Sequence, residues 1–162
     1  MQATTRLYPT TALEDWVTDF YSRLGIVKPE HIKEEVIARK CDIYIHRKPR
    51  SSFYEIVGRY RGITVDNRVL PSIQREMFFH ELSHILRHAG NQLMMPKAFK
   101  ELQERDSYHF TRYAAIPHHM IHFIDLEDPY VIDQMTSLFK VTPELCIERL
   151  MQIQKRMKRD VW

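Results

Sequence analysis

Apolar residues recur at helical spacing near the start of the chain and again throughout its second half. Thr11 begins a capping-box pattern, and apolar residues follow it at intervals of three and four until Gly25, where we expect the helix to stop. A second helix is expected from about Pro29 to Arg39. After Pro71 the pattern again becomes helical, and it predicts four helices, near 71–89, 97–116, 129–140 and 143–158.

Between these two helical regions the pattern is that of short strands. Residues 42–46 alternate apolar and polar side chains, and Phe53–Arg59 and Ile63–Asp66 are further strand candidates, with Gly58 and Gly62 bracketing the expected turn. Helices therefore precede and follow a small sheet. This order favours an α+β fold, in which a small, mostly antiparallel sheet packs against a helical bundle.

The length and composition fit one globular domain. We expect a single domain over residues 1–162, with its core at roughly 10–155 and the helix pair 129–158 as a subregion. The net charge of +3 does not indicate a nucleic-acid partner, and no stretch has the apolar length of a membrane span. Cys41 and Cys146 have apolar neighbours and suggest buried thiols in a reducing cytoplasm.

The clearest chemical signal is His80-Glu-Leu-Ser-His84, an H-E-x-x-H motif. Two histidines four residues apart project from the same side of a helix, so both imidazoles can bind one metal ion. Zinc suits such ligands, and a catalytic zinc needs a third protein ligand and a water. Glu81 would then take a proton from that water. Phe78, Phe79 and Leu82 fall on one apolar side of this helix, and the motif residues fall together on the opposite side. A surface helix that carries histidines by chance would show the same pattern.

The helix expected at 97–116 offers the third ligand. Glu104 lies on a face of small side chains, which would let two helices approach as closely as a shared metal requires. Ordinary helix packing would produce the same face, and Glu101 and Asp106 compete with Glu104 as ligands. The small residues of this face are Ser107, Thr111, Ala114 and Ala115.

The paired motifs resemble those of the ImmA/IrrE metallo-endopeptidases. The resemblance rests on His80–His84 followed by Glu104–Pro117, and it extends to Gly62–Asn67 and Val131–Leu150, covering roughly residues 10–155. It implies that Zn²⁺ is bound by three residues, with a fourth as the catalytic base. The implied ligands are His80, His84 and Glu104, and the implied base is Glu81.

The resemblance also implies a substrate. Members of this family cleave or inactivate helix-turn-helix transcriptional repressors, often in prophages and integrative elements. We therefore expect a cytoplasmic zinc endopeptidase that acts on such a repressor. The alternative is an antirepressor that binds and sequesters the repressor without cutting it. DNA binding by the helices near 129–140 and 143–158 would leave the metal motif unexplained, and the oligomeric state stays open.

Residues around the expected metal site are less well determined. Tyr108 stands where the family usually has Asn or Asp, a residue that would hold a ligand histidine in position. His88 is expected to cap the end of its helix, and a substrate strand is expected to add near Ile63–Asn67. The tetrahedral intermediate of hydrolysis needs a second electrophile, for which the candidates are Tyr108, Tyr113, His118, His119 and His122.

Overall fold

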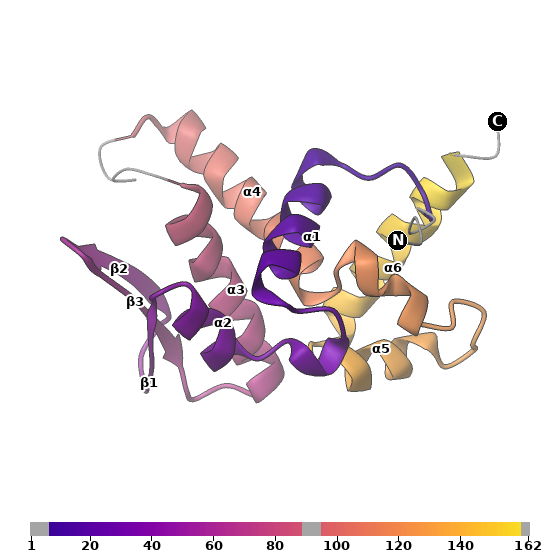
Figure 1. The fold of residues 1–162 in the computed structure, drawn as a ribbon, viewed down its shortest axis with the longest axis horizontal. Helices are drawn as coiled ribbons and strands as arrows, with labels where there is room; N and C mark the ends of the chain where they lie inside the picture. Colours follow the sequence, from indigo (N-terminus) through magenta and orange to yellow (C-terminus); the bar gives the residue numbers. More distant parts are fainter. Residues whose placement is uncertain (1–6, 89–94, 160–162) are drawn as a thin grey trace.

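The computed structural model describes residues 7–88 and 95–159. The helices and strands, in chain order, are α1 (Ala12–Leu24), η1 (Pro29–His31), α2 (Glu34–Lys40), β1 (Tyr44–Lys48), β2 (Phe53–Val57), β3 (Tyr60–Asp66), α3 (Pro71–Arg87), α4 (Lys97–Ala115), η3 (His118–Phe123), α5 (Val131–Phe139) and α6 (Pro143–Arg159). The fold is α+β, as predicted. In Figure 1 the sheet lies at one end of the long axis and α5 with α6 at the other, with α3 and α4 between them. None of the helices formed by these residues is long and apolar enough to cross a membrane.

Helix α1 begins and ends where the sequence predicts. The Thr11 hydroxyl accepts a hydrogen bond from the Glu14 N–H at 3.2 Å, and the Glu14 carboxylate accepts one from the Thr11 N–H at 3.2 Å. These two bonds form the capping box. Gly25 ends the helix in the left-handed conformation, with φ 73°.

The prediction of one continuous helix from about Pro29 to Arg39 is wrong, because the structure has two separate helical segments there. Residues 29–31 form the short η1, and α2 starts only at Glu34. The intervening Ile32 has an extended backbone and a buried side chain. The Ile32 carbonyl accepts a hydrogen bond from Arg75 of α3 at 2.9 Å. In a continuous helix this carbonyl would instead accept a backbone N–H, so a contact distant in sequence replaces the helical hydrogen bond.

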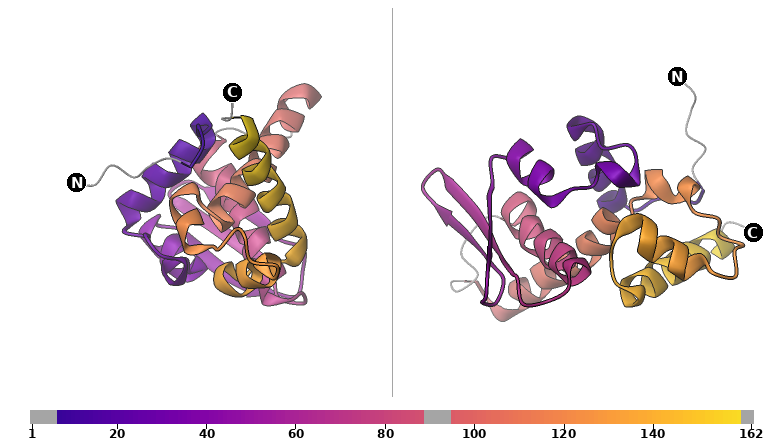
Figure 2. Two further views of the ribbon diagram at one scale, coloured as in Figure 1. Left: turned by 90° about the vertical axis from the view of Figure 1, so that its right-hand side faces the viewer. Right: turned by 90° about the horizontal axis from the view of Figure 1, so that it is seen from below.

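The sheet has three strands in the order β1-β3-β2. Strand β3 pairs in parallel with β1 and antiparallel with β2, so the sheet is mixed rather than mostly antiparallel. Ile63 and Val65 of β3 are buried in the main core, which also contains Phe78, Phe79 and Leu82 of α3. Figure 2 shows the sheet against α3 from two further directions.

The central position of β3 corrects two expectations about this strand. It begins at Tyr60, so Gly62 lies inside the strand and only Gly58, with φ 59°, takes a turn conformation. A side chain on Gly62 would meet the Tyr60 ring, with the hydroxyl oxygen 2.5 Å from the added carbon. Because β3 is flanked on both sides, Ile63–Asn67 is not the edge to which a substrate strand can add; β2 and β1 are the edge strands.

Helices α5 and α6 pack on each other and on the core. Phe139 and Leu145 are buried on either side of the connection, and Lys140 ends α5 in the left-handed conformation. The Thr142 hydroxyl accepts a hydrogen bond from the Leu145 N–H at 3.2 Å and so caps α6. Helix α3 ends at Arg87, and position 89 of the predicted range lies outside the described residues.

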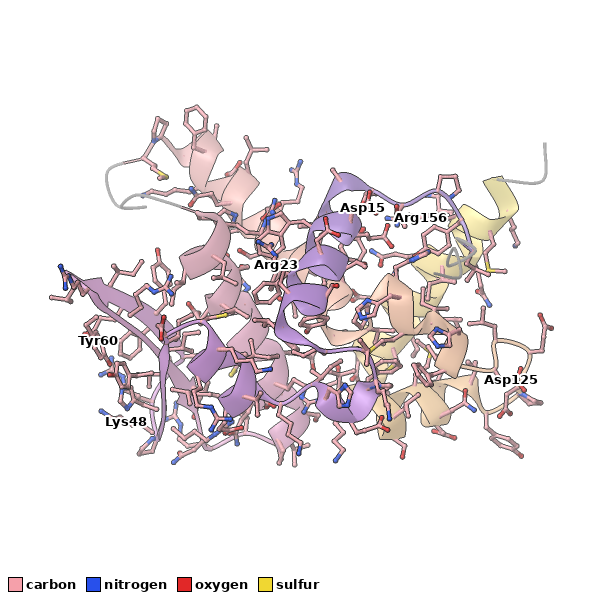
Figure 3. The ribbon with its side chains drawn as sticks, viewed as in Figure 1. Asp15, Arg23, Lys48, Tyr60, Asp125 and Arg156 are labelled. Atoms are coloured by element: carbon pink, nitrogen blue, oxygen red, sulfur yellow. The ribbon has the colours of Figure 1, made fainter. Side chains whose placement is uncertain are left out.

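A buried ion-pair network joins α1 to α6. The Glu14 and Arg149 side chains are both fully buried, and Arg149 Nη2 lies 3.4 Å from Glu14 Oε2. Tyr8 donates a hydrogen bond to the same oxygen at 2.7 Å, and Arg156 donates to the other carboxylate oxygen. Arg149 Nε also donates to the Ile116 carbonyl at 2.9 Å. Figure 3 shows Arg156 beside the start of α1. This network connects the two outer helices around the end of α4.

Candidate metal centre

Helix α3 holds the H-E-x-x-H motif against the core. Phe78, Phe79 and Leu82 are fully buried on its core side, which is the side predicted for them. The opposite side does not face solvent alone, because α4 packs against it. His84 is 2 % exposed as a result, whereas His80 is half-buried.

The close approach of α3 and α4 depends on hydroxyl-bearing residues. The Ser83 hydroxyl donates to the Ser107 hydroxyl at 2.6 Å, and both side chains are completely buried. Thr111 follows one turn later and donates to the Ser107 carbonyl at 2.9 Å. These short side chains bring the helices together one turn from Glu104. Phe110 of α4 is buried, whereas Phe99 and Leu102 near the start of the same helix are exposed.

Glu104 reaches both histidines of the motif. Its Oε1 lies 3.1 Å from His84 Nε2, and its Oε2 lies 3.2 Å from His80 Nε2. The two histidine nitrogens are 3.4 Å apart. The competing carboxylates are bound elsewhere: Glu101 pairs with Lys97 at 3.9 Å, and Asp106 pairs with Arg87 at 2.9 Å. The structure thus brings together the three predicted ligands.

The spacing of these three ligand atoms fits zinc. Tetrahedral zinc bonded to nitrogen and oxygen at about 2.0–2.1 Å keeps its ligand atoms about 3.3 Å apart. Each Glu104 oxygen lies 3.1 or 3.2 Å from one histidine nitrogen, and the two nitrogens are 3.4 Å apart, so the three side chains approach one another at about that value. Two imidazoles and one carboxylate also form a common set of ligands for catalytic zinc, and they leave a fourth position for water.

Burial sets the protonation states at this site. Burial lowers the pKa of His84 to about 4, so this imidazole is neutral near pH 7, the form that binds metal. Burial, with a smaller contribution from the negative charge of Glu104, raises the pKa of Glu81 to about 7. A carboxylate with that pKa can both accept and return a proton near neutral pH.

Tyr54 is a site residue that the sequence analysis missed. Its ring stacks on the His84 ring, with the centroids 5.2 Å apart and the planes 19° from parallel. Burial, and then the charges of Glu81 and Glu104, raise the pKa of its hydroxyl. Tyr54 belongs to β2, and only the order of the strands brings it to α3. No local motif in the sequence signals this contact.

His88 lies between His84 and Asp106 and contacts both side chains. His88 ends α3 by donating its backbone N–H to the His84 carbonyl, which is the capping role predicted for it. In addition, its ring Nδ1 lies 3.1 Å from His84 Nδ1, and its Nε2 lies 2.9 Å from Asp106 Oδ2. Arg87 donates to both oxygens of Asp106, at 2.9 and 3.2 Å. The sequence analysis missed this connection, although His88 lies four residues after His84.

Comparison with known proteins places this site in a family. The family described as Peptidase_M78, IrrE N-terminal-like domain, matches residues 38–151, which include the three candidate ligands and Glu81. The chain belongs to this family. The resemblance to ImmA/IrrE proteins stated above is therefore confirmed, and membership indicates a metallopeptidase-like protein.

Two relatives from Bacillus subtilis (strain 168) extend the match beyond that segment. The phage-like element PBSX protein XkdA is 33 % identical over 146 residues, which cover 89 % of this chain and 74 % of XkdA. The uncharacterized protein YqaB is 32 % identical over 159 residues, covering 96 % of this chain and 91 % of YqaB. The similarity to a phage-element protein agrees with the mobile-element context that the family resemblance implied.

This Peptidase_M78 chain does not direct Tyr108 to the ligand histidines. Its hydroxyl donates to Glu148 of α6 at 2.5 Å, and the Arg112 guanidinium lies over its ring. Tyr113 also interacts with α6, because its hydroxyl accepts a hydrogen bond from Arg156 at 2.7 Å. These contacts of both tyrosines join α4 to α6. Their hydroxyls bond to Glu148 and Arg156, not to Glu104.

The histidines of η3 contact the opposite part of the protein. His118 packs edge-on against the Tyr8 ring, and His119 Nε2 donates to the Ile26 carbonyl at 3.1 Å. His122 is exposed and lies against the Phe123 ring. The contacts of His118 and His119 are with the segment around α1, and that of His122 lies within η3; none of these contacts is with the motif of α3. Tyr54 of β2, by contrast, contacts the candidate ligand His84 of α3.

Proposed function

We propose that this protein is a zinc-dependent endopeptidase that cleaves, and so inactivates, a helix-turn-helix transcriptional repressor. One observation carries the proposal. The Glu104 carboxylate meets His80 and His84 at the separations that zinc ligands have, and Glu81 is half-buried next to them in the motif. Family membership and the phage-element relative support the choice of a protein substrate.

Hydrolysis would use the side chains as follows. Bound zinc would supply a Lewis acid that polarises the scissile carbonyl and lowers the pKa of water. Glu81 would accept a proton from the attacking water as its oxygen bonds to the carbonyl carbon. Glu81 would then return this proton to the amide nitrogen as the C–N bond breaks. The Tyr54 hydroxyl would donate a hydrogen bond to the oxygen on which negative charge develops.

The free edge of β2 would hold the substrate. Strand β2 pairs with β3 on one side only, and Tyr54 brings this strand to the metal ligand His84. An extended peptide can add to such an edge through backbone hydrogen bonds. The substrate chain would then run alongside α3, with its scissile bond close to Glu81. Because the cutting site must be extended, a linker or an unfolded segment of the repressor is the expected target.

Removal of Glu104 tests the metal site. Glu104→Ala should lose the zinc that the wild-type protein retains at one ion per chain, because two imidazoles alone complete too little of the coordination shell. Elemental analysis after dialysis measures this. Glu101→Ala is the matched control, since Glu101 is an exposed carboxylate one turn earlier in α4. Equal zinc in both variants would exclude Glu104 as a ligand.

Incubation with a candidate helix-turn-helix repressor tests the function. Zinc-loaded protein should convert the repressor into two fragments, which mass spectrometry can locate, and Glu104→Ala should not. An intact repressor in a stable complex would instead favour the sequestering antirepressor. Repressor that is neither cut nor bound would contradict both. Action on a repressor would place the protein in the cytoplasm, where Cys41 and Cys146, which form no disulfide, would stay reduced.

Tyr54→Phe tests the role of the tyrosine hydroxyl. The ring would still stack on His84, so we expect zinc content to be unchanged. The kcat for peptide cleavage should fall by about 10²–10³-fold, the usual effect of removing one donor to a developing oxyanion. Tyr44→Phe is the control, because Tyr44 is an exposed tyrosine on the other edge strand. A kcat within twofold of wild type would remove Tyr54 from the mechanism.

A further inference from the structure

A line of four polar side chains leads away from the candidate metal centre. His84 Nδ1 lies 3.1 Å from His88 Nδ1, and His88 Nε2 lies 2.9 Å from Asp106 Oδ2. Arg87 donates two hydrogen bonds to Asp106, and its guanidinium lies over the Trp16 ring of α1, 5.0 Å from the centroid. The His88 side chain is only 9 % exposed. Water therefore has little access to its ring nitrogens.

The direction of these hydrogen bonds follows from Asp106. Arg87 donates to both oxygens of Asp106, and a guanidinium that always carries a positive charge pairs in this way with an ionised carboxylate. Ionised Asp106 can only accept. His88 Nε2 therefore donates to Asp106, and a ring that carries its one hydrogen on Nε2 has Nδ1 left as an acceptor.

An acceptor at His88 Nδ1 determines which nitrogen of His84 carries the hydrogen. Only one of two facing ring nitrogens can donate, so His84 Nδ1 donates to His88. The lone pair of His84 is then on Nε2, the atom that lies 3.1 Å from Glu104 and 3.4 Å from His80 Nε2. A metal ion binds the lone pair of a neutral imidazole, so this tautomer is the one that can bind zinc.

We propose that His88 is a positioning residue, which together with Asp106 fixes the tautomer and ring orientation of the zinc ligand His84. This inference rests on the zinc site of the proposed function. It assigns to a histidine of α3 and a carboxylate of α4 the role that the family pattern gives to the Asn or Asp at position 108, where this chain has a tyrosine directed to α6. Tyr54, which stacks on the face of the His84 ring, limits its rotation further.

Zinc affinity measured by chelator competition, without any substrate, tests the proposal. His88→Phe keeps a planar ring but no acceptor, and we expect it to bind zinc about 10–100-fold more weakly than wild type. His88→Asn offers an amide oxygen near the former Nδ1 and should recover most of that loss. Asp106→Asn, which can donate to His88 Nε2 and so permit the wrong tautomer, should weaken zinc binding as well. Glu101→Gln, an exposed carboxamide substitution on the same helix, should leave the affinity unchanged.

A spectroscopic signature separates positioning from general damage to the fold. In the zinc-loaded wild type, histidine-selective ¹⁵N NMR should show His84 bound through Nε2, with a protected, downfield-shifted Nδ1 proton. That proton should lose its protection in His88→Phe and keep it in His88→Asn. Wild-type affinity in both His88→Phe and Asp106→Asn would overturn the positioning role. It would also be overturned if His88→Asn bound zinc no better than His88→Phe while both stayed folded by circular dichroism.

The outcome is independent of repressor cleavage. If the variants lose zinc as expected but the wild type cuts no repressor, the positioning role stands and the substrate assignment fails. If the wild type cuts a repressor but the variants keep full zinc affinity, the proposed function stands and the role of His88 fails. If the wild type binds no zinc, the metal site and the role of His88 fail together.

Discussion

Replacement of Glu81 by Gln is expected to lower the rate of peptide hydrolysis by about 10²–10⁴-fold, the usual contribution of a general base. The amide has nearly the same size as the carboxylate, but it cannot accept the proton of the attacking water. Zinc should be retained at the wild-type level, because the three ligand atoms belong to other residues. Single-turnover cleavage of the repressor measures the rate, and elemental analysis measures the metal.

Two observations would contradict the assignment of Glu81. A rate within tenfold of wild type would show that another group takes the proton. Loss of zinc together with activity would show that Glu81 contributes to metal binding. The assignment gives that role to His80, His84 and Glu104 instead. Glu101→Gln again serves as the control, since it makes the same chemical change at an exposed position of α4.

The second large effect is on stability. Arg149→Met should lower the free energy of unfolding by about 3–5 kcal/mol, because it leaves the fully buried Glu14 carboxylate without its buried partner. It also removes the hydrogen bond to the Ile116 carbonyl. Arg105→Met, at an exposed position of α4, should change stability by no more than about 0.5 kcal/mol. Urea unfolding followed by circular dichroism measures both variants.

The double variant Glu14→Gln/Arg149→Met refines this prediction. With no charge at position 14, most of the penalty for an unpaired buried carboxylate disappears, so the double variant should be more stable than Arg149→Met alone. Arg156, which also donates to Glu14, is only partly buried and can turn toward solvent in that variant. A loss below about 1 kcal/mol in Arg149→Met would mean that Arg156 alone balances Glu14.

Features encoded within a few residues were predicted well. The capping box at Thr11 and the left-handed stop at Gly25 depend on neighbouring backbone groups, and both occur in the structure. The same holds for the separation of core and ligand sides on α3, which the 3.6-residue period determines. The local sequence was not enough to identify Glu104 as the third ligand, since Glu101 and Asp106 also carry carboxylates. The family resemblance indicated the residue that α4 does bring to the histidines.

Features that depend on distant contacts were missed. No local sequence signal indicates the parallel pairing of β1 with β3. Without that pairing, the sequence could not show that β2 is an edge strand beside the candidate metal ligands. Tyr54 reaches His84 only through that strand order. The break at Ile32 follows from a hydrogen bond to Arg75, 43 residues away. Likewise, Asp106 acquires its position behind His88 only when α4 docks on α3.

The ion pair between Glu14 and Arg149 also has a consequence for protein synthesis. The two residues are 135 positions apart, and ribosomes add roughly 5–20 residues per second, so the carboxylate waits for several seconds or longer before its partner has been made. For about the second half of that time the motif of α3 has already been synthesised, but α1 still lacks the contact that holds it to α6. A chain built in this order completes its scaffold only after all three candidate metal ligands have been made.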